Sequence, residues 1–252
     1  LKQKKKLMKN DDKRLDTWNN ILRTVLAMPG AKINRDSFLR AEFSKRCSKE
    51  VTELIIQTSP AKAKISNEIV DIIANSCIKN TKVKTSSISF AAGLPGGWWM
   101  AASIPADVTQ FYYHIIILVQ KLAYTYGWKE LYSDEADNVD EETLYELSLF
   151  IGVMMGSVQA ISGLKILADS FAKEVSHRLP KKALTKYAIY NIAKQVGKWI
   201  SIKVTKDSFA RGVAKVIPVI GGFVSFGITF FSFGKMSSRL KKHLKELVFA
   251  KE

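Results

Sequence analysis

Two long stretches of this sequence contain no charged residue, and proline and glycine interrupt both of them. The first, 86–105, reads SSISFAAGLPGGWWMAASIP, and the second, 216–234, reads VIPVIGGFVSFGITFFSFG. Apolar side chains must leave water, but proline and central glycines prevent a single straight helix from burying them. Each stretch therefore predicts a hairpin of two short helices, and we expect the two hairpins to pack on each other at the centre of the fold.

Outside those stretches, apolar residues recur every three or four positions, which is the spacing of amphipathic helices. A first helix is predicted over 11–28 and a second over 35–58. The pair Ser59-Pro60 has the residue types favoured at a helix start and predicts that a third helix begins there. The side chains expected to face inward are Leu15, Trp18, Leu22, Val25, Leu39, Phe43, Cys47, Val51, Leu54, Ile55, Ile65, Ile69, Ile72, Ile73 and Cys77.

The segment after the first uncharged stretch predicts a long, central and buried helix. We expect it to run from Ser103 or Ile104 to Tyr126, because the glycine that follows, Gly127, is the residue type favoured just after a helix. Asp107 lies in its first turn, where a carboxylate stabilises the positive helix end; the alternative is that it binds a cation or a partner. His114 lies two turns further on, and we favour a hydrogen-bonded core histidine over a functional one.

A further helix is predicted after an N-cap at Asp140. Between 147 and 164 no charge appears, while Gly152, Gly156 and Gly163 do. Small residues at such spacing allow two helix backbones to approach each other closely. Basic helices are then expected over 182–215.

The charge of the chain is strongly positive, at +16 over 252 residues. Lysine and arginine cluster in 2–14, 178–215 and 235–245, and such a balance favours polyanionic partners. Solvated helix faces are the alternative explanation for each cluster, but the clusters flank apolar segments, which favours a docking face. One acidic island interrupts the pattern and contains Glu130, Asp134, Glu135, Asp137, Asp140, Glu141, Glu142 and Glu146.

Composition indicates a globular chain in a reducing compartment. Hydrophobic residues make up 47% of the sequence, enough to bury a sizeable core. Cys47 and Cys77 form neither a disulfide framework nor a zinc motif. No secretory signal is visible, and because the chain begins with Leu1 we expect a few residues to precede it. We therefore expect a cytoplasmic protein.

Several motifs share their order and spacing with one family. The first group consists of Gly93-Leu94-Pro95-Gly96-Gly97, Ile104-Pro105-Ala106-Asp107, Tyr124, Tyr126 and Gly127, and the later group is Ile217-Pro218-Val219-Ile220-Gly221-Gly222. Over about residues 60–245 the chain resembles the EcsC family of bacterial proteins, although Trp98-Trp99 stand where smaller residues are expected. The resemblance implies a helical, membrane-associated bacterial protein and supplies no mechanism.

No catalytic constellation is present in the sequence. It lacks a phosphate-binding loop, a dinucleotide-binding glycine motif and a Gly-x-Ser-x-Gly elbow, and the three histidines match no zinc spacing. We therefore predict no catalytic residue, no metal site and no cofactor. A hydrolase acting on lipid or peptide would need Asp107, His114 and a serine in one pocket.

The sequence thus predicts an all-α protein with one compact multi-helix domain at 59–252 and a helical extension at 1–58. Its expected partner is an anionic membrane surface at the inner membrane, or a membrane protein such as a transporter; a membrane-damaging module is the alternative. Nucleic acid is not expected, since no recognition motif accompanies the charge. The motif candidates are Gly93, Pro95, Gly96, Gly97, Pro105, Asp107, His114, Pro218, Gly221 and Gly222. Trp98, Trp99, Lys235, Arg239, Lys241 and Lys242 are the candidates for membrane contact, with core packing as the alternative for the two tryptophans.

Overall fold

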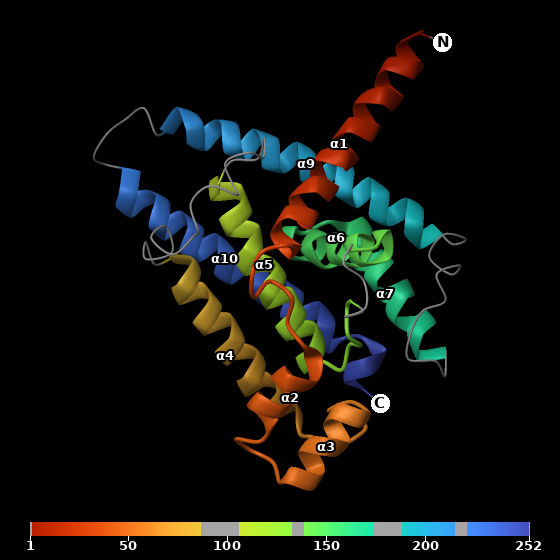
Figure 1. Ribbon diagram of the computed structural model, residues 1–252, viewed down its shortest axis with the longest axis vertical. Coiled ribbons are helices and arrows are strands. Elements are labelled where there is room, and N and C mark those ends of the chain that lie inside the picture. Colours follow the sequence, from red (N-terminus) through yellow and green to blue (C-terminus); the bar gives the residue numbers. More distant parts are fainter. Residues whose placement is uncertain (1, 87–105, 133–138, 174–187, 215–220, 252) are drawn as a thin grey trace.

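Every regular element in the described part of the chain is a helix (Figure 1). The computed structural model describes residues 2–86, 106–132, 139–173, 188–214 and 221–251. The elements are α1 (Lys2–Leu26), α2 (Arg35–Phe43), α3 (Lys49–Gln57), α4 (Asn67–Ser86), α5 (Ala106–Thr125), α6 (Glu141–Met155), α7 (Val158–Lys173), α9 (Ala188–Ala214), α10 (Gly221–Lys245) and the short 3-10 helix η3 (Val248–Ala250). The prediction of a compact all-α domain is confirmed.

Helix α5 lies at the centre of the fold, as predicted. It packs against α1, α2, α4, α6 and α10. Its residues Ile115, Ile116, Val119 and Leu122 are fully buried, because an all-apolar helix surface is stable only when neighbours cover it on every side. The helix ends at Thr125, one residue before the predicted end, and the predicted closing glycine, Gly127, has a φ of +86°, a left-handed conformation that glycine adopts without strain.

The N-terminal helix α1 belongs to the same core as the later helices. Trp18 is fully buried, and its indole Nε1 donates a hydrogen bond of 2.7 Å to Ser148 Oγ on α6. Its ring also meets that of Tyr112 edge to face, with centroids 5.1 Å apart. The predicted inward stripe of α1 is confirmed, since Leu15, Trp18, Leu22 and Val25 are all buried.

The single helix predicted over 35–58 is wrong, because α2 and α3 are separate helices. Ser48 interrupts the pattern as an N-cap, its Oγ accepting a hydrogen bond from the amide of Val51. The break turns α3, so that Leu54, predicted to face inward, is 44% exposed. The third helix also begins later than predicted: Ser59 Oγ bonds only the amide of Lys62 in a turn, and α4 starts at Asn67.

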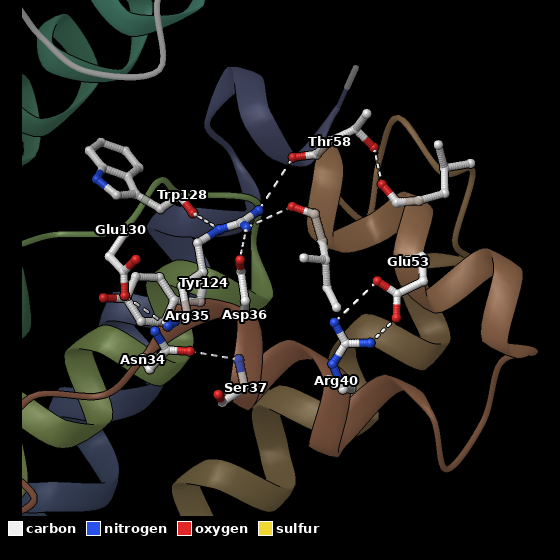
Figure 2. A network of polar contacts seen from close by, with 12 residues as sticks. Asn34, Arg35, Asp36, Ser37, Arg40, Glu53, Thr58, Tyr124, Trp128 and Glu130 are labelled. Atoms are coloured by element: carbon white, nitrogen blue, oxygen red, sulfur yellow. Dashed lines mark hydrogen bonds and ion pairs between the residues drawn. The ribbon is translucent and has the colours of Figure 1, made fainter. Parts of the chain in front are cut away.

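Arg35 ties this broken pair to the rest of the molecule, as Figure 2 shows. Its side chain is 11% exposed and donates hydrogen bonds to the backbone carbonyls of Ile56 (2.8 Å), Thr58 (3.3 Å) and Trp128 (3.1 Å). Two of these carbonyls end α3, where helix geometry leaves acceptors without intrahelical partners. The guanidinium thereby joins the start of α2, the end of α3 and the loop after α5.

The predicted close approach of helices at glycine is confirmed at two positions. A Cβ added to Gly152 would lie 2.5 Å from Val196 Cγ1 on α9, and one added to Gly163 would lie 2.9 Å from Ile192 Cγ2 on the same helix. Gly156 differs from these two, because its φ of +87° ends α6 beside the guanidinium of Arg239.

The hairpins predicted in the two uncharged stretches are not confirmed. Residues 87–105 and 215–220 lie outside the described residues, while the second stretch from Gly221 onward forms part of the single helix α10. Within the described residues, no helix is both long enough and apolar enough to cross a membrane.

Candidate functional site

A half-buried ionic cluster joins the three helices α4, α5 and α10 at one end. Asp71 Oδ1 accepts a hydrogen bond of 2.9 Å from Tyr126 Oη, and its Oδ2 accepts one of 2.8 Å from Lys245 Nζ. Lys241 Nζ lies 3.4 Å from Asp71 Oδ1. Burial acts to raise the pKa of Asp71, but the hydrogen bonds from Lys245 and Tyr126 and the charge of Lys241 outweigh it and lower the pKa. The carboxylate is therefore a charged anchor between three helices.

The contacts of α4 with its partners define their directions. Asp71, near the start of α4, meets Tyr126, just beyond the end of α5, and Lys245, the last residue of α10. Further along α4, its contacts are with earlier residues of α10: Asn75 accepts a hydrogen bond from Lys241, and Lys82 lies beside Gly234. Helix α4 is therefore antiparallel to both partners, so its carboxyl end lies with the amino ends of α5 and α10.

Both uncharged stretches are attached to this common end, opposite the Asp71 cluster. The first connects the last residue of α4 to the first residue of α5, and most of the second forms the amino-terminal half of α10. Figure 1 shows these helix ends on the same side of the molecule, together with the carboxyl end of α9. We call this region the uncharged end.

Helix α10 extends past its partner at the uncharged end. When the register of the contacts is continued, Ser86 at the end of α4 lies opposite Phe230, so Gly221–Thr229 reaches beyond α4. At 1.5 Å per residue this extension is about 13 Å long. Its sequence contains no charge, whereas Lys79 and Lys235, further back on the two helices, are exposed lysines.

The predicted motif residues are only partly described. Gly93, Pro95, Gly96, Gly97, Trp98, Trp99, Pro105 and Pro218 lie outside the described residues. Asp107 lies in the first turn of α5, as predicted, and Gly221 and Gly222 are the first residues of α10. His114 is 3% exposed and its ring packs edge to face on Tyr113, with centroids 5.5 Å apart, which places it in the core.

The four basic candidates for membrane contact divide into two pairs. Arg239 Nη1 donates a hydrogen bond of 2.7 Å to the carbonyl of Met154 and so caps the end of α6. The Lys241 side chain is 18% exposed and is held by Asp71 and Asn75. Lys235 and Lys242 are exposed. Only the second pair is placed to meet an external partner, while the first pair stabilises the fold.

One buried acid was not foreseen from the sequence. Glu146, assigned to the acidic island, lies on the inner side of α6. Burial, reinforced by the charges of Asp140 and Glu142, raises the pKa of Glu146 to about 8, against opposing contributions from Trp128 and Lys129. Its neighbours Leu144, Tyr145 and Leu147 are all buried. The apolar residues around Glu146 in the sequence could therefore have predicted its burial, whereas counting it with the nearby acidic residues did not.

Glu146 is expected to make the protein less stable as pH rises from about 4.5 to 8. In that interval the folded protein keeps a proton that the unfolded chain has released, so the free energy of unfolding falls with a slope that approaches about 1.4 kcal/mol per pH unit. The neutral amide of Glu146→Gln removes this slope. Urea unfolding of both proteins at several pH values measures it, and parallel curves for the two proteins would contradict a protonated Glu146.

The described residues hold no group of three or more His, Cys, Asp or Glu side chains able to bind a metal ion. Comparison with known proteins gives no relative: no family model, no curated protein and no solved structure matches this chain. The arrangement of the site is therefore the basis for any functional conclusion.

Proposed function

We propose that this protein is a non-enzymatic, peripheral protein of an anionic membrane surface, the cytoplasmic face of the inner membrane, and that its uncharged end meets the lipid. One observation carries the proposal: antiparallel packing around Asp71 puts the two helix ends that the first uncharged stretch connects at the same end of one helix trio as the amino end of α10. Two uncharged stretches joined to the same end can contact one bilayer together. Two stretches on different sides of the molecule could not.

The charge of the chain supports the same conclusion. Each lysine or arginine near an anionic bilayer contributes about 1 kcal/mol of attraction, and the net charge is +16. The resemblance of the two motif groups to the EcsC family agrees with a membrane-associated role. The alternative within this proposal is that the same end binds a membrane protein instead of the lipid itself.

Co-sedimentation with lipid vesicles tests the proposal. We expect the protein to pellet with vesicles that contain an anionic phospholipid, and to pellet much less with vesicles of phosphatidylcholine alone. Added salt should weaken the binding, because it screens exposed charges. Release of a dye trapped in the vesicles would identify a membrane-damaging module instead, and equal absence of binding to both kinds of vesicle would refute the proposal.

A pair of matched variants tests the position of the contact. Trp98→Glu/Trp99→Glu adds two charges to the first uncharged stretch and is expected to abolish vesicle binding. The control, Leu54→Glu/Val158→Glu, adds the same charges at two exposed apolar residues of α3 and α7. Equal losses in the two variants would attribute binding to net charge alone. A tryptophan variant that unfolds would show that the stretch belongs to the core, which also contradicts the proposed position.

A further inference from the structure

Helix α9 carries a basic face that the helical core leaves uncovered. One side of the helix is buried against α1, α6 and α7 through Ile189, Ala193, Val196, Ile200 and Val204. On the opposite side Asn191, Gln195 and Lys203 are exposed, and Lys194, Lys198, Trp199 and Ile202 are half-buried. The sequence contains no acidic residue from 175 to 206, and α9 carries Asp207 as its single acidic residue against five lysines and arginines, so the helix is strongly basic.

Two aromatic rings hold lysines at the margins of that face. Lys194 Nζ lies 4.1 Å from the centroid of the Tyr190 ring, and Lys203 Nζ lies 4.8 Å from the centroid of the Trp199 ring. Each pair is separated by four residues, the spacing at which side chains on a helix meet. Such cation–π contacts keep the ammonium groups beside the helix and oriented, and they leave the N–H groups able to bind anions.

None of these lysines is neutralised within the described part of the protein. No carboxylate there lies within ion-pair distance of Lys194, Lys198 or Lys203, whereas Lys241 and Lys245 share Asp71. Half-buried tyrosine and tryptophan beside lysine is the combination that suits the headgroup level of a bilayer. The helix also ends at the same side of the molecule as the uncharged end (Figure 1).

We infer that the outer face of α9, formed by Tyr190, Lys194, Lys198, Trp199 and Lys203, binds the phosphate headgroups of an anionic bilayer. This inference rests on the proposed function and assigns its electrostatic contact to one helix. The three ammonium groups meet lipid phosphates and the half-buried Trp199 ring lies beside the headgroups. Tyr190, whose ring packs edge to face on Tyr145 of α6 with centroids 5.0 Å apart, holds Lys194 in place.

Charge removal on α9 tests the inference against a matched control. Lys194→Gln/Lys198→Gln/Lys203→Gln is expected to lower the partition coefficient onto vesicles containing an anionic phospholipid by about 100-fold. The control triple, Lys32→Gln/Lys49→Gln/Lys64→Gln, removes the same charge from exposed lysines before α2, at the start of α3 and before α4. We expect it to lose less than about fivefold. Equal losses would overturn the inference, and so would an α9 triple that binds as the unmodified protein does.

A direct probe keeps the test independent of the stability of the triple variant. An environment-sensitive dye is attached at Gln195→Cys on α9 or, as the control, at Gln57→Cys on α3, which is also exposed, with Cys47 and Cys77 replaced by alanine. Anionic vesicles should shift the emission of the dye on α9 to the blue and leave the dye on α3 unchanged. A shift at neither position, in protein that still pellets with the vesicles, overturns the inference and leaves the proposed function standing.

Two other results distinguish this inference from the proposed function and from nucleic-acid binding. An unmodified protein that fails to bind anionic vesicles refutes the proposed function and this inference together. Tighter binding to a single-stranded oligonucleotide than to the vesicles, lost in the α9 triple, assigns the face to nucleic acid and overturns the assignment to lipid.

Discussion

Replacing Trp128 by alanine is expected to lower the free energy of unfolding by about 3–5 kcal/mol, the usual cost of removing a large buried aromatic side chain. The indole is almost fully buried. Its ring meets those of Phe150, Phe171 and Phe249 edge to face, with centroids 5.0, 5.5 and 5.2 Å away. Those three rings belong to α6, α7 and η3, so the cavity would open where three elements join.

Urea denaturation followed by circular dichroism measures this loss. Trp199→Ala is the control, because it removes the same side chain from a half-buried position on α9. The control should lose less stability, since less of its surface leaves water on folding. Equal losses for the two variants would show that the aromatic cluster around Trp128 is not a centre of stability.

Replacing Gly152 by valine is expected to destabilise the protein by about 3 kcal/mol, because it overfills a closed helix junction. Its new Cβ would lie 2.5 Å from Val196 Cγ1 and 2.6 Å from Ala160 Cβ. Both neighbours are fully buried and cannot swing away into solvent. Helices α6, α7 and α9 would have to separate to admit the side chain.

Gly234→Ala is the control for that experiment and should have the opposite sign. Gly234 also lies within a helix, but the atom nearest to its added Cβ is Lys82 Nζ at 3.3 Å, the far end of a flexible side chain. The substitution should therefore gain up to about 1 kcal/mol from the better helix propensity of alanine. Thermal and urea unfolding compare the two, and a Gly152→Val protein as stable as the unmodified one would contradict the close packing.

Local sequence patterns were sufficient for much of the fold. The stripe through Leu15 and Trp18, the helix end at Gly127 and the N-cap at Asp140 were all predicted, and the structure confirms them. Each depends on neighbours within about one or two helical turns, where side-chain spacing and capping chemistry act directly. The same holds for the glycines of α6 and α7, whose small size is visible in the sequence itself.

Other features depended on contacts that no local pattern contains. The apolar spacing typical of a helix continues across Ser48, so α2 and α3 were predicted as one helix. In the structure Ser48 is the N-cap at which α3 begins. Ile72, predicted to face inward, is exposed, and Glu146, counted with a charged surface, is buried. Burial is decided by which helix covers a face, and a single amphipathic pattern does not specify its partner.

The amino-acid sequence by itself determined that the chain is helical, strongly basic and provided with two uncharged stretches. Only the tertiary structure decided that the helix ends flanking the first stretch lie beside the amino end of α10, because that arrangement depends on the contact of Asp71 with Lys245, 174 residues away in the sequence. An ionic contact between residues so distant becomes possible only after the helices between them have packed, so periodicity and charge counts do not reveal it.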